Sequence, residues 1–236
     1  MVDIIRINKF FTEHGICSRR EADRLIEAGR VTINDVVAKL GDQVTPADVI
    51  ARDGQVIPWG QARIYLKYHK PVGVTTTSEA HVPRNIIQEI GHPERIFPIG
   101  RLDKDSSGLI LLTNDGDIVN DILRTEFGHE REYEVVLDRP YDQSVLDRLA
   151  AGVVILGRKT KPCRIERLGP KRFRIVLTEG RNRQIRRMSQ AVGYRVVALH
   201  RVRIMHITLA GLAAGSWKPL TPREREELLK AVGRTS

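Results

Sequence analysis

Residues 97–116 read FPIGRLDKDSSGLILLTNDG, and this stretch places one aspartate, Asp103, between two apolar runs. The second run, residues 109–112, leads into the turn Asn114-Asp115-Gly116. Gly100 and Gly108 lack Cβ atoms, so the backbone there can bend sharply or lie close against a ligand. A carboxylate held in such a turn can serve as a nucleophile or base. The alternative is an aspartate that only caps the turn, which is common.

Predicted strands and helices mix on both sides of this stretch. Residue patterns predict strands at 64–69, 133–137, 164–168, 173–177 and 195–202, and helices at 117–124, 143–150 and 182–191. Thr221-Pro222-Arg223-Glu224 is a capping box with proline at the first helical position, so it opens a last helix. We therefore predict an α+β fold, with a largely antiparallel mixed sheet flanked by helices.

The first 60 residues have a different organisation. Ser18-Arg19-Arg20-Glu21 is a capping-box pattern that opens a helix, and Gly29 ends it. Short β-like runs at 31–33 and 36–38 meet at Asn34-Asp35, which predicts a hairpin. A break follows at residues 58–61, PWGQ. The expected domains are therefore residues 1–60 and 61–236.

Composition suits a cytoplasmic globular protein of 236 residues. No apolar run approaches the roughly 20 residues needed to cross a bilayer, and the N-terminus does not resemble a signal peptide. Cys17 and Cys163 are far apart and match no metal-ligand spacing, so we expect two reduced thiols and no bound metal.

The net charge of +10 is unevenly distributed along the chain. Residues 1–62 hold 8 Lys and Arg against 9 Asp and Glu, whereas residues 158–203 hold 15 against 2. Such a surplus favours a polyanionic partner bound through its phosphates. Solubility or an anionic membrane could also explain it. No amphipathic helix with a large apolar face accompanies the surplus, so nucleic acid is the preferred prediction.

A local group of basic residues occurs in the otherwise neutral first domain. Arg19, Arg20 and Arg24 fall on or near one face of the helix after Ser18, and Arg6 and Lys9 lie just before it. These side chains could dock on RNA phosphates, or they could form an ordinary solvated helix face. The order of features over residues 4–50, with INKFF, GICSRREADRLIEAGRV and an IND turn, resembles the S4 RNA-binding domain.

Chemistry-bearing residues gather at three places in the second domain: the turn around Asp103, the segment 131–135 (REYEV) and the segment 179–188 (EGRNRQIRRM). On the last segment Arg183, Arg186 and Arg187 share a helix face. They could bind RNA phosphate, or one of them could hold Asp103 ionised and oriented. Alternatively, Tyr133 only packs in a strand and the arginines only cover a helix surface.

Together these segments resemble the RsuA-like family of RNA pseudouridine synthases with an N-terminal S4 domain. The matching motifs are KPVG at 70–73, FPIGRLDKDSSGL at 97–109, REYEV, EGRNRQIRRM and RVRIM at 201–205. They occur in the family's order and, with the first domain, cover nearly the whole chain. Within the family the chain is most similar to the RluF group, which acts on 23S ribosomal RNA and can also modify tyrosine tRNA.

The resemblance implies an isomerase that converts uridine to pseudouridine without metal or cofactor. It assigns Asp103 as the catalytic aspartate, Tyr133 as the tyrosine stacked on the base, and Arg186 as the arginine paired with the aspartate. Target uridines must leave their stack to reach such a site. Further RNA contacts are expected from Lys70, Arg101, Arg181, Arg183 and Arg187.

Other functions remain open from the sequence. The same chemistry could act on a 16S ribosomal RNA uridine, or the chain could be a non-catalytic S4-type binding or assembly factor for ribosomal RNA. A metal-dependent hydrolase built on Asp103, Asp105 and Asp115 is a third possibility, although these acids lack convincing ligand spacing. We expect a monomer.

Overall fold

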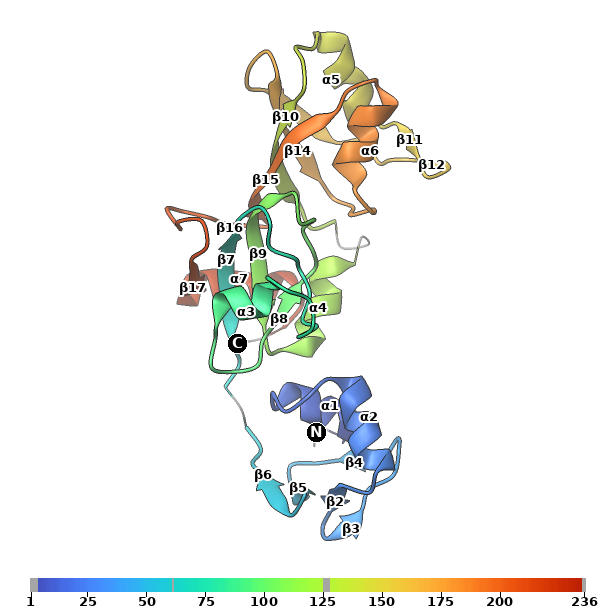
Figure 1. Cartoon of the computed structure of the whole chain (residues 1–236), viewed down its shortest axis with the longest axis vertical. Helices are drawn as coiled ribbons and strands as arrows, with labels where there is room; N and C mark the ends of the chain where they lie inside the picture. Colours follow the sequence, from blue (N-terminus) through green and yellow to red (C-terminus); the bar gives the residue numbers. More distant parts are fainter. Residues whose placement is uncertain (1–3, 61, 125–127, 235–236) are drawn as a thin grey trace. The chain divides into compact units, whose positions relative to one another are not determined.

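The computed structural model describes residues 4–60, 62–124 and 128–234, and these form two compact units (Figure 1). The first unit contains residues up to 64 together with 92–96 and 113–116, and the second unit contains the rest. Each unit is described by itself below.

The first unit packs two helices on small sheets. Its elements are β1 (Ile5–Arg6), α1 (Ile7–Glu13), α2 (Arg19–Glu27), β2 (Val31–Ile33), β3 (Val36–Val37), β4 (Gln43–Val44), β5 (Ile50–Arg52) and β6 (Gln55–Ile57). Strands β3, β2, β5 and β6 form one antiparallel sheet in that order, and β1 pairs with β4. Ile7, Phe10 and Phe11 of α1 are buried against α2 and the strands.

Local sequence explains how this unit is built. The Ser18 hydroxyl accepts a hydrogen bond from the Glu21 backbone N–H at 3.2 Å, which confirms the predicted start of α2. Asn34 and Asp35, which connect β2 to β3, both have positive φ, at 50° and 65°. Two such residues form the type I′ turn that matches the twist of a hairpin, so that prediction is also confirmed.

The second unit is organised around one mixed sheet. Its elements are β7 (Tyr65–Lys70), α3 (Ile86–Ile90), β8 (Phe97–Ile99), β9 (Ser107–Thr113), α4 (Gly116–Leu123), β10 (Arg131–Leu137), α5 (Gln143–Ala150), β11 (Val154–Ile155), β12 (Arg158–Lys159), β13 (Arg164–Arg167), β14 (Arg172–Leu177), α6 (Gln184–Ala191), β15 (Val196–Ile204), β16 (Ile207–Thr208), β17 (Trp217–Pro219) and α7 (Pro222–Ala231). Within the described residues, nine strands form the sheet, and its main path is β13-β14-β10-β15-β9-β7-β17. The predicted α+β fold with a largely antiparallel sheet is confirmed.

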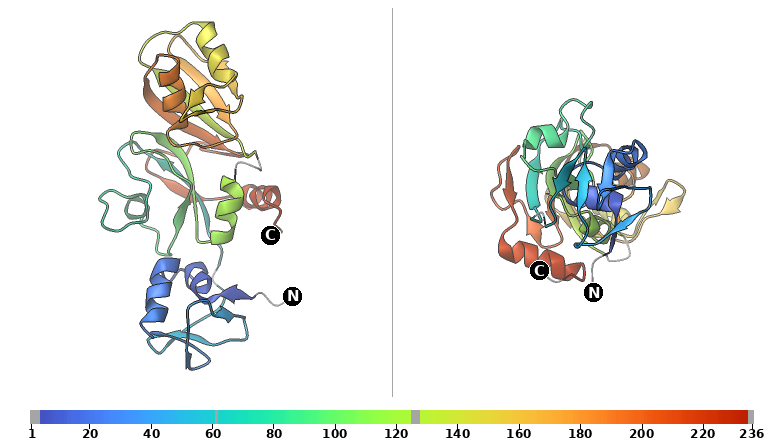
Figure 2. Two further views of the ribbon diagram at one scale, coloured as in Figure 1. Left: turned by 90° about the vertical axis from the view of Figure 1, so that its right-hand side faces the viewer. Right: turned by 90° about the horizontal axis from the view of Figure 1, so that it is seen from below.

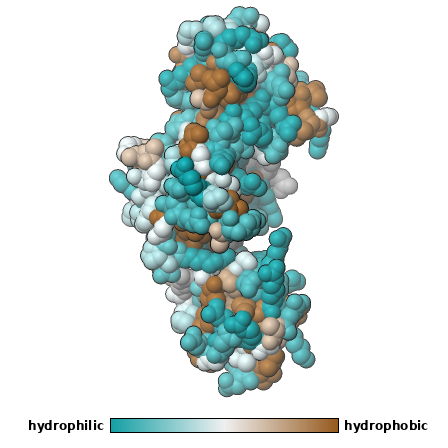
Figure 3. All heavy atoms as spheres, in the orientation of Figure 1, coloured by the Kyte–Doolittle hydropathy of each residue, from teal (hydrophilic) through white to brown (hydrophobic). Residues whose placement is uncertain are grey.

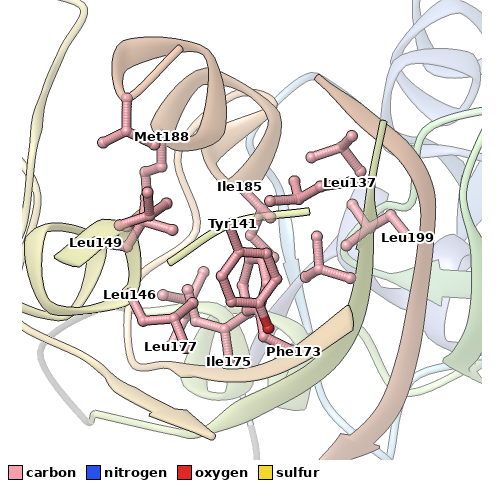
Figure 4. Close-up of a cluster of buried hydrophobic side chains, with 14 of the residues drawn as sticks. Leu137, Tyr141, Leu146, Leu149, Phe173, Ile175, Leu177, Ile185, Met188 and Leu199 are labelled. Carbon is pink, nitrogen blue, oxygen red and sulfur yellow. The ribbon is translucent and has the colours of Figure 1, made fainter. Parts of the chain in front are cut away.

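One half of the sheet, β13-β14-β10-β15, has two very different faces. Alternate residues of β10 and β14, including Val135, Leu137 and Phe173, point into an apolar core covered by α5 and α6 (Figure 4). Figures 1 and 2 show the two helices lying against this part of the sheet. The intervening residues of these strands point to the opposite face and are mostly charged.

The other half of the sheet has its own core. Leu109 and Leu111 of β9 pack with residues of α4 and α7, including Ile118 and Leu228. Helix α7 begins at the predicted capping box, in which the Thr221 hydroxyl and the Glu224 carboxylate each accept the other's backbone N–H.

The two halves join where β15 pairs with β9 in parallel, through His200 with Ser107 and Arg201 with Gly108. Gly108 has φ +114°, and a Cβ atom there would lie 2.2 Å from the Arg201 carbonyl oxygen. Because no side chain fits in that space, glycine is required for the two backbones to approach. This junction directly follows the Asp103 turn.

Candidate active site

Asp103 lies in the turn between β8 and β9. Gly100 begins the turn with φ +76°, and a Cβ there would contact a Leu123 methyl carbon at 2.9 Å. The turn closes through a hydrogen bond from the Ser106 N–H to the Asp103 carbonyl oxygen at 3.0 Å. The Asp103 carboxylate remains partly exposed, as a group that reacts with a substrate must be.

Two arginines from the start of α6 contact the Asp103 carboxylate. Its Oδ2 atom lies 3.3 Å from Arg183 Nη1 and 3.9 Å from Arg186 Nε. Asp105 Oδ2 lies 3.3 Å from the Nη2 atom of each arginine. The result is a cluster of two carboxylates and two guanidinium groups at the mouth of the site, in which opposite charges orient each other.

The two arginines are held differently. Arg186 is only 13% exposed, and its Nη atoms donate to the carbonyl oxygens of Val196 and Asp105 and to the Ser106 hydroxyl. Its Nε atom has no hydrogen-bond partner among the described residues and faces Asp103. Arg183 is 43% exposed, and within the described chain its guanidinium contacts are the two carboxylates. Arg186 is thus fixed, whereas Arg183 can exchange partners.

Tyr133 completes the constellation expected from the sequence. It lies on β10, half-buried, in a pocket of about 440 Å³ that Asp103 also lines. The apolar walls of this pocket include Ile99, Leu111 and Ile122. Aliphatic walls that meet several polar and charged side chains suit a flat nucleobase with polar edges. Asp103, Tyr133 and Arg183 therefore line one cavity, and Arg186 contacts Asp103 without lining it.

Two residues of this pocket were missed at the level of sequence. Arg131 and Arg201 line it and are 8% and 3% exposed. Arg131 stands two residues before Tyr133 on the same strand, so the period of two in a strand places both on one face. The sequence REYEV shows this alternation, but it does not show that Arg131 is buried.

Lys70 is fully buried, so the structure does not present it to RNA phosphates as the sequence suggested. Its Nζ atom donates to the Pro71 carbonyl oxygen at 2.9 Å. Burial lowers the Lys70 pKa to about 8, against the opposing attraction of Asp105 and Asp103. Lys70 is therefore a buried cation that interacts electrostatically with Asp105 and Asp103.

The other predicted RNA contacts of the second unit differ in availability. Arg101 is exposed and lines the pocket. Arg181 contacts Glu179 and donates to the carbonyl oxygens of Arg158 and Lys159, so its guanidinium is largely occupied. Arg187 donates to Asn182.

In the first unit Arg6, Arg19, Arg20 and Arg24 are exposed, as an RNA-binding surface requires. Arg24 also pairs with Glu21 at 3.1 Å, and Lys9 pairs with Glu13 at 3.3 Å. Arg19 and Arg20 stand at the first turn of α2.

The charged face of the half-sheet β13-β14-β10-β15 changes the charge distribution that was inferred from the sequence. Arg174 there contacts Glu132, Glu134 and Glu166 at 3.0–3.2 Å. Within the described residues this ion-pair ladder contains eight members: Arg164, Arg172, Arg174, Arg203, Glu130, Glu132, Glu134 and Glu166. Three of its glutamates lie outside the window 158–203, so the surplus counted there overstates the basic surface.

The described part of the chain has neither a membrane-spanning helix nor a cluster of metal ligands. None of its helices is long and apolar enough to span a membrane. On the face in Figure 3, apolar residues form separate patches among hydrophilic ones. No group of three or more His, Cys, Asp and Glu residues with metal-binding geometry occurs among the described residues.

The chain is similar to known proteins over nearly its whole length. The family described as RNA pseudouridylate synthase matches residues 64–191, and the S4 domain matches residues 5–50. The chain is 47% identical to the Escherichia coli K12 dual-specificity RNA pseudouridine synthase RluF, over 98% of this chain and 81% of the relative. It is 34% identical to ribosomal large subunit pseudouridine synthase B of Bacillus subtilis, over 94% of this chain and 95% of the relative.

Two further similarities are informative. Ribosomal small subunit pseudouridine synthase A of Pasteurella multocida is 34% identical, over 93% of this chain and 97% of the relative. A crystal structure of a pseudouridylate synthase superposes with a TM-score of 0.70 at 31% identity, over 95% of this chain and 99% of that chain.

Proposed function

The chain belongs to the family of RNA pseudouridylate synthases, and on that premise we propose that its substrate is a uridine of 23S ribosomal RNA, with tyrosine tRNA as a second substrate. The reaction class follows from the family: the chain is an RNA pseudouridine synthase. The choice of RNA is supported by the 47% identical relative, which is named for dual specificity, and by the large-subunit synthase of Bacillus subtilis. We place the reaction in the cytoplasm and assign it to a monomer.

The reaction exchanges one bond of the ribose for another. The C1′–N1 bond of uridine breaks, the base turns, and a C1′–C5 bond forms. The C5 proton is lost and N1 gains a proton, so the product is an isomer of the substrate. No cofactor is needed to balance these steps.

The observation that carries the proposal is the meeting of Asp103 and Tyr133 in one pocket, with Arg186 fixed behind the carboxylate. In the proposed mechanism Asp103 attacks the nucleoside or assists the departure of the base. Tyr133 stacks on the base and helps to remove the C5 proton. Arg186 holds the Asp103 carboxylate in place through its anchored guanidinium.

RNA recognition is proposed to involve both domains, residues 1–60 and 61–236. Arg101 and Arg183 are exposed beside the pocket and would hold the phosphates next to the flipped uridine. Arg6, Arg19, Arg20 and Arg24 of the S4 domain would add contacts to the RNA backbone.

A second candidate substrate is a 16S ribosomal RNA uridine, because a 34% identical relative is named as a small-subunit synthase. Pseudouridines should therefore be mapped in 23S, 16S and transfer RNA from cells with and without the gene. The proposal predicts a lost site in 23S RNA and in tyrosine tRNA. If a site is lost only from 16S RNA, then 16S RNA is the substrate in place of 23S RNA. If no site is lost from any of these RNAs, the proposal is overturned.

Complementation of the deletion separates catalysis from binding. Asp103→Asn should fail to restore the pseudouridine, whereas Asp105→Asn should restore it. Asp105 is the matched control because it contacts the same two arginines, at 3.3 Å, but does not line the pocket. Restoration by Asp103→Asn would favour the non-catalytic binding or assembly factor.

A further inference from the structure

The floor of the catalytic pocket contains two buried guanidinium groups that the catalytic trio does not use. Arg131 lies on β10 and Arg201 on β15, and both line the pocket beside Tyr133. Tyr133 and Arg201 are directly opposite each other in the sheet, and the Arg201 Cζ atom lies 5.9 Å from the centre of the tyrosine ring.

These two arginines lack the partners that normally accompany a buried charge. Within the described residues neither has a carboxylate within 4.0 Å, and each donates a hydrogen bond to one backbone carbonyl group. Arg131 Nη2 donates to the Ile122 oxygen at 3.1 Å, and Arg201 Nε donates to the Leu109 oxygen at 2.6 Å. The Arg201 Nη2 atom is buried without a hydrogen-bond partner among the described residues.

Such an arrangement costs folding free energy. A buried charge is stabilised by an opposite charge or by full hydrogen bonding, and here two like charges lie close together. Burial lowers the pKa of Arg131, and Arg201 lowers it further, although Tyr133 opposes this. A pair of aliphatic residues would fill the same space at lower cost, so the retained charge points to an anion that enters during function.

The chemistry of the pocket distinguishes between two anions. A phosphate would meet the exposed Arg101 and Arg183 at the mouth of the pocket. The interior has apolar walls, including Ile99, Leu111 and Ile204, which suit a flat base and not a hydrated phosphate. The reaction supplies such a base as an anion, because breaking the C1′–N1 bond leaves its electron pair on uracil, where the charge spreads onto O2 and O4.

We propose that Arg131 and Arg201 hold the uracil base while it is detached from the ribose and stabilise the negative charge that it then carries. This inference rests on the proposed function. The C1′–N1 electron pair moves onto the base during detachment and returns to the sugar through C5 when the C1′–C5 bond forms. Fixed and buried positive groups in the pocket favour that state over the bound uridine, which is neutral.

The test uses single-turnover rates of the full chain on an RNA that contains the mapped uridine. Arg131→Met and Arg201→Met should each slow pseudouridine formation by roughly 100-fold to 1,000-fold, the usual effect of losing one group that stabilises developing charge. The dissociation constant for the RNA should change by less than about twofold. RNA affinity comes chiefly from contacts to the phosphates, whereas these two arginines are proposed to contact the base. Arg203→Met is the matched control, since Arg203 lies on the same strand but contacts Glu130 and Glu132 of the ion-pair ladder.

A second substrate makes the result independent of how much variant protein is folded. The target uridine is replaced by 4-thiouridine, a more acidic base that carries negative charge more readily. The ratio of the 4-thiouridine rate to the uridine rate should rise at least about tenfold in both Met variants and stay constant in Arg203→Met. If a Met variant yields no folded protein, Arg131→Lys or Arg201→Lys replaces it; each keeps a shorter cation and should show a smaller rise.

The outcomes separate the two claims. If the wild-type chain does not form pseudouridine in the mapped RNA, the proposed function fails. If the wild type is active and the rate ratio is unchanged in the variants, only the buried-cation inference fails. A weaker RNA affinity with a smaller salt dependence and an unchanged rate would show that the pair binds phosphate instead, which also overturns the inference.

Discussion

Arg183 Nη1 lies 3.3 Å from Asp103 Oδ2, which makes it the nearer of the two arginines that contact this carboxylate. Arg183 is the N-cap of α6 and has a left-handed backbone, with φ 48°. This conformation turns the chain at the start of the helix and brings the side chain over both Asp103 and Asp105. An exposed cation in that position can leave the carboxylate for a substrate phosphate.

Replacing the two arginines should therefore have different effects. Arg186→Gln should lower the maximal rate by roughly 100-fold, because the anchored group that orients Asp103 is lost. Arg183→Gln should raise KM by about tenfold and change the maximal rate much less, because it removes a phosphate contact. Steady-state kinetics at two salt concentrations would distinguish the effects.

Arg187→Gln provides the control for charge loss on the same helix, because Arg187 contacts only Asn182 in the described structure. It should reproduce a part of the KM change and none of the rate change. An Arg186→Gln enzyme with a normal maximal rate would contradict the positioning role of Arg186.

The junction between β9 and β15 should not tolerate any side chain at Gly108. Gly108→Ala would place a Cβ atom 2.2 Å from the Arg201 carbonyl oxygen at φ +114°, so the two strands must separate. We expect a loss of at least about 3 kcal/mol in the free energy of unfolding, measured by urea denaturation.

Gly193→Ala is the matched control for that substitution. Gly193 also has positive φ, at +90°, but no atom lies within 4 Å of its Cβ position. The free energy of unfolding of this variant should fall by only about 1 kcal/mol, because only backbone strain is added. Equal losses for the two variants would show that the close approach at Gly108 does not matter.

Lys70 should make the stability of the chain depend on pH. Its pKa is about 8 in the folded state against 10.5 ordinarily, so between these values the unfolded chain binds more protons. The free energy of unfolding from this group therefore rises as pH increases from about 8 to 10.5. Below pH 8 the buried charge costs about 3 kcal/mol, from a shift of this size.

Lys70→Met isolates this contribution. The variant should gain stability relative to the wild type as pH falls from 10.5 to 8, and the difference should level off below pH 8. Urea denaturation of both proteins across this range cancels the titration of all other groups. A constant difference at all pH values would mean that Lys70 is not buried as a charged group.

The ion-pair ladder should contribute little to RNA binding. Arg172→Gln or Arg174→Gln removes a cation that carboxylates already neutralise, so RNA affinity should change by less than about twofold. Arg101→Gln removes an exposed cation beside the pocket and should weaken binding by several-fold with a smaller salt dependence. Comparable losses from both sites would show that the ladder opens to bind RNA.

The sequence predicted those features that depend on near neighbours. The cap at Ser18, the hairpin turn at Asn34-Asp35 and the capping box at Thr221 each involve residues within a few positions, so local patterns sufficed. The motif around Asp103 also identified the turn of the candidate site. Strand predictions were accurate to within two residues at β10 and β15.

The pairing of charges could not be predicted in this way. Glu132 and Arg174 meet because β10 and β14 are neighbours in one register, and a count along the chain cannot contain that information. For the same reason the sequence shows which segment is rich in Lys and Arg, but not which of these side chains carboxylates neutralise on the folded surface.

The sequence by itself determined the local elements, the order of motifs and hence the family, because these depend on short-range geometry and on residue identity. Only the tertiary structure decided that Arg183 shares Asp103 with Arg186, that Lys70 is buried, and that Arg131 and Arg201 form the floor of the pocket. Each of these relationships joins segments far apart in the chain. They depend on strand register and on the close approach at Gly108, which no local pattern specifies.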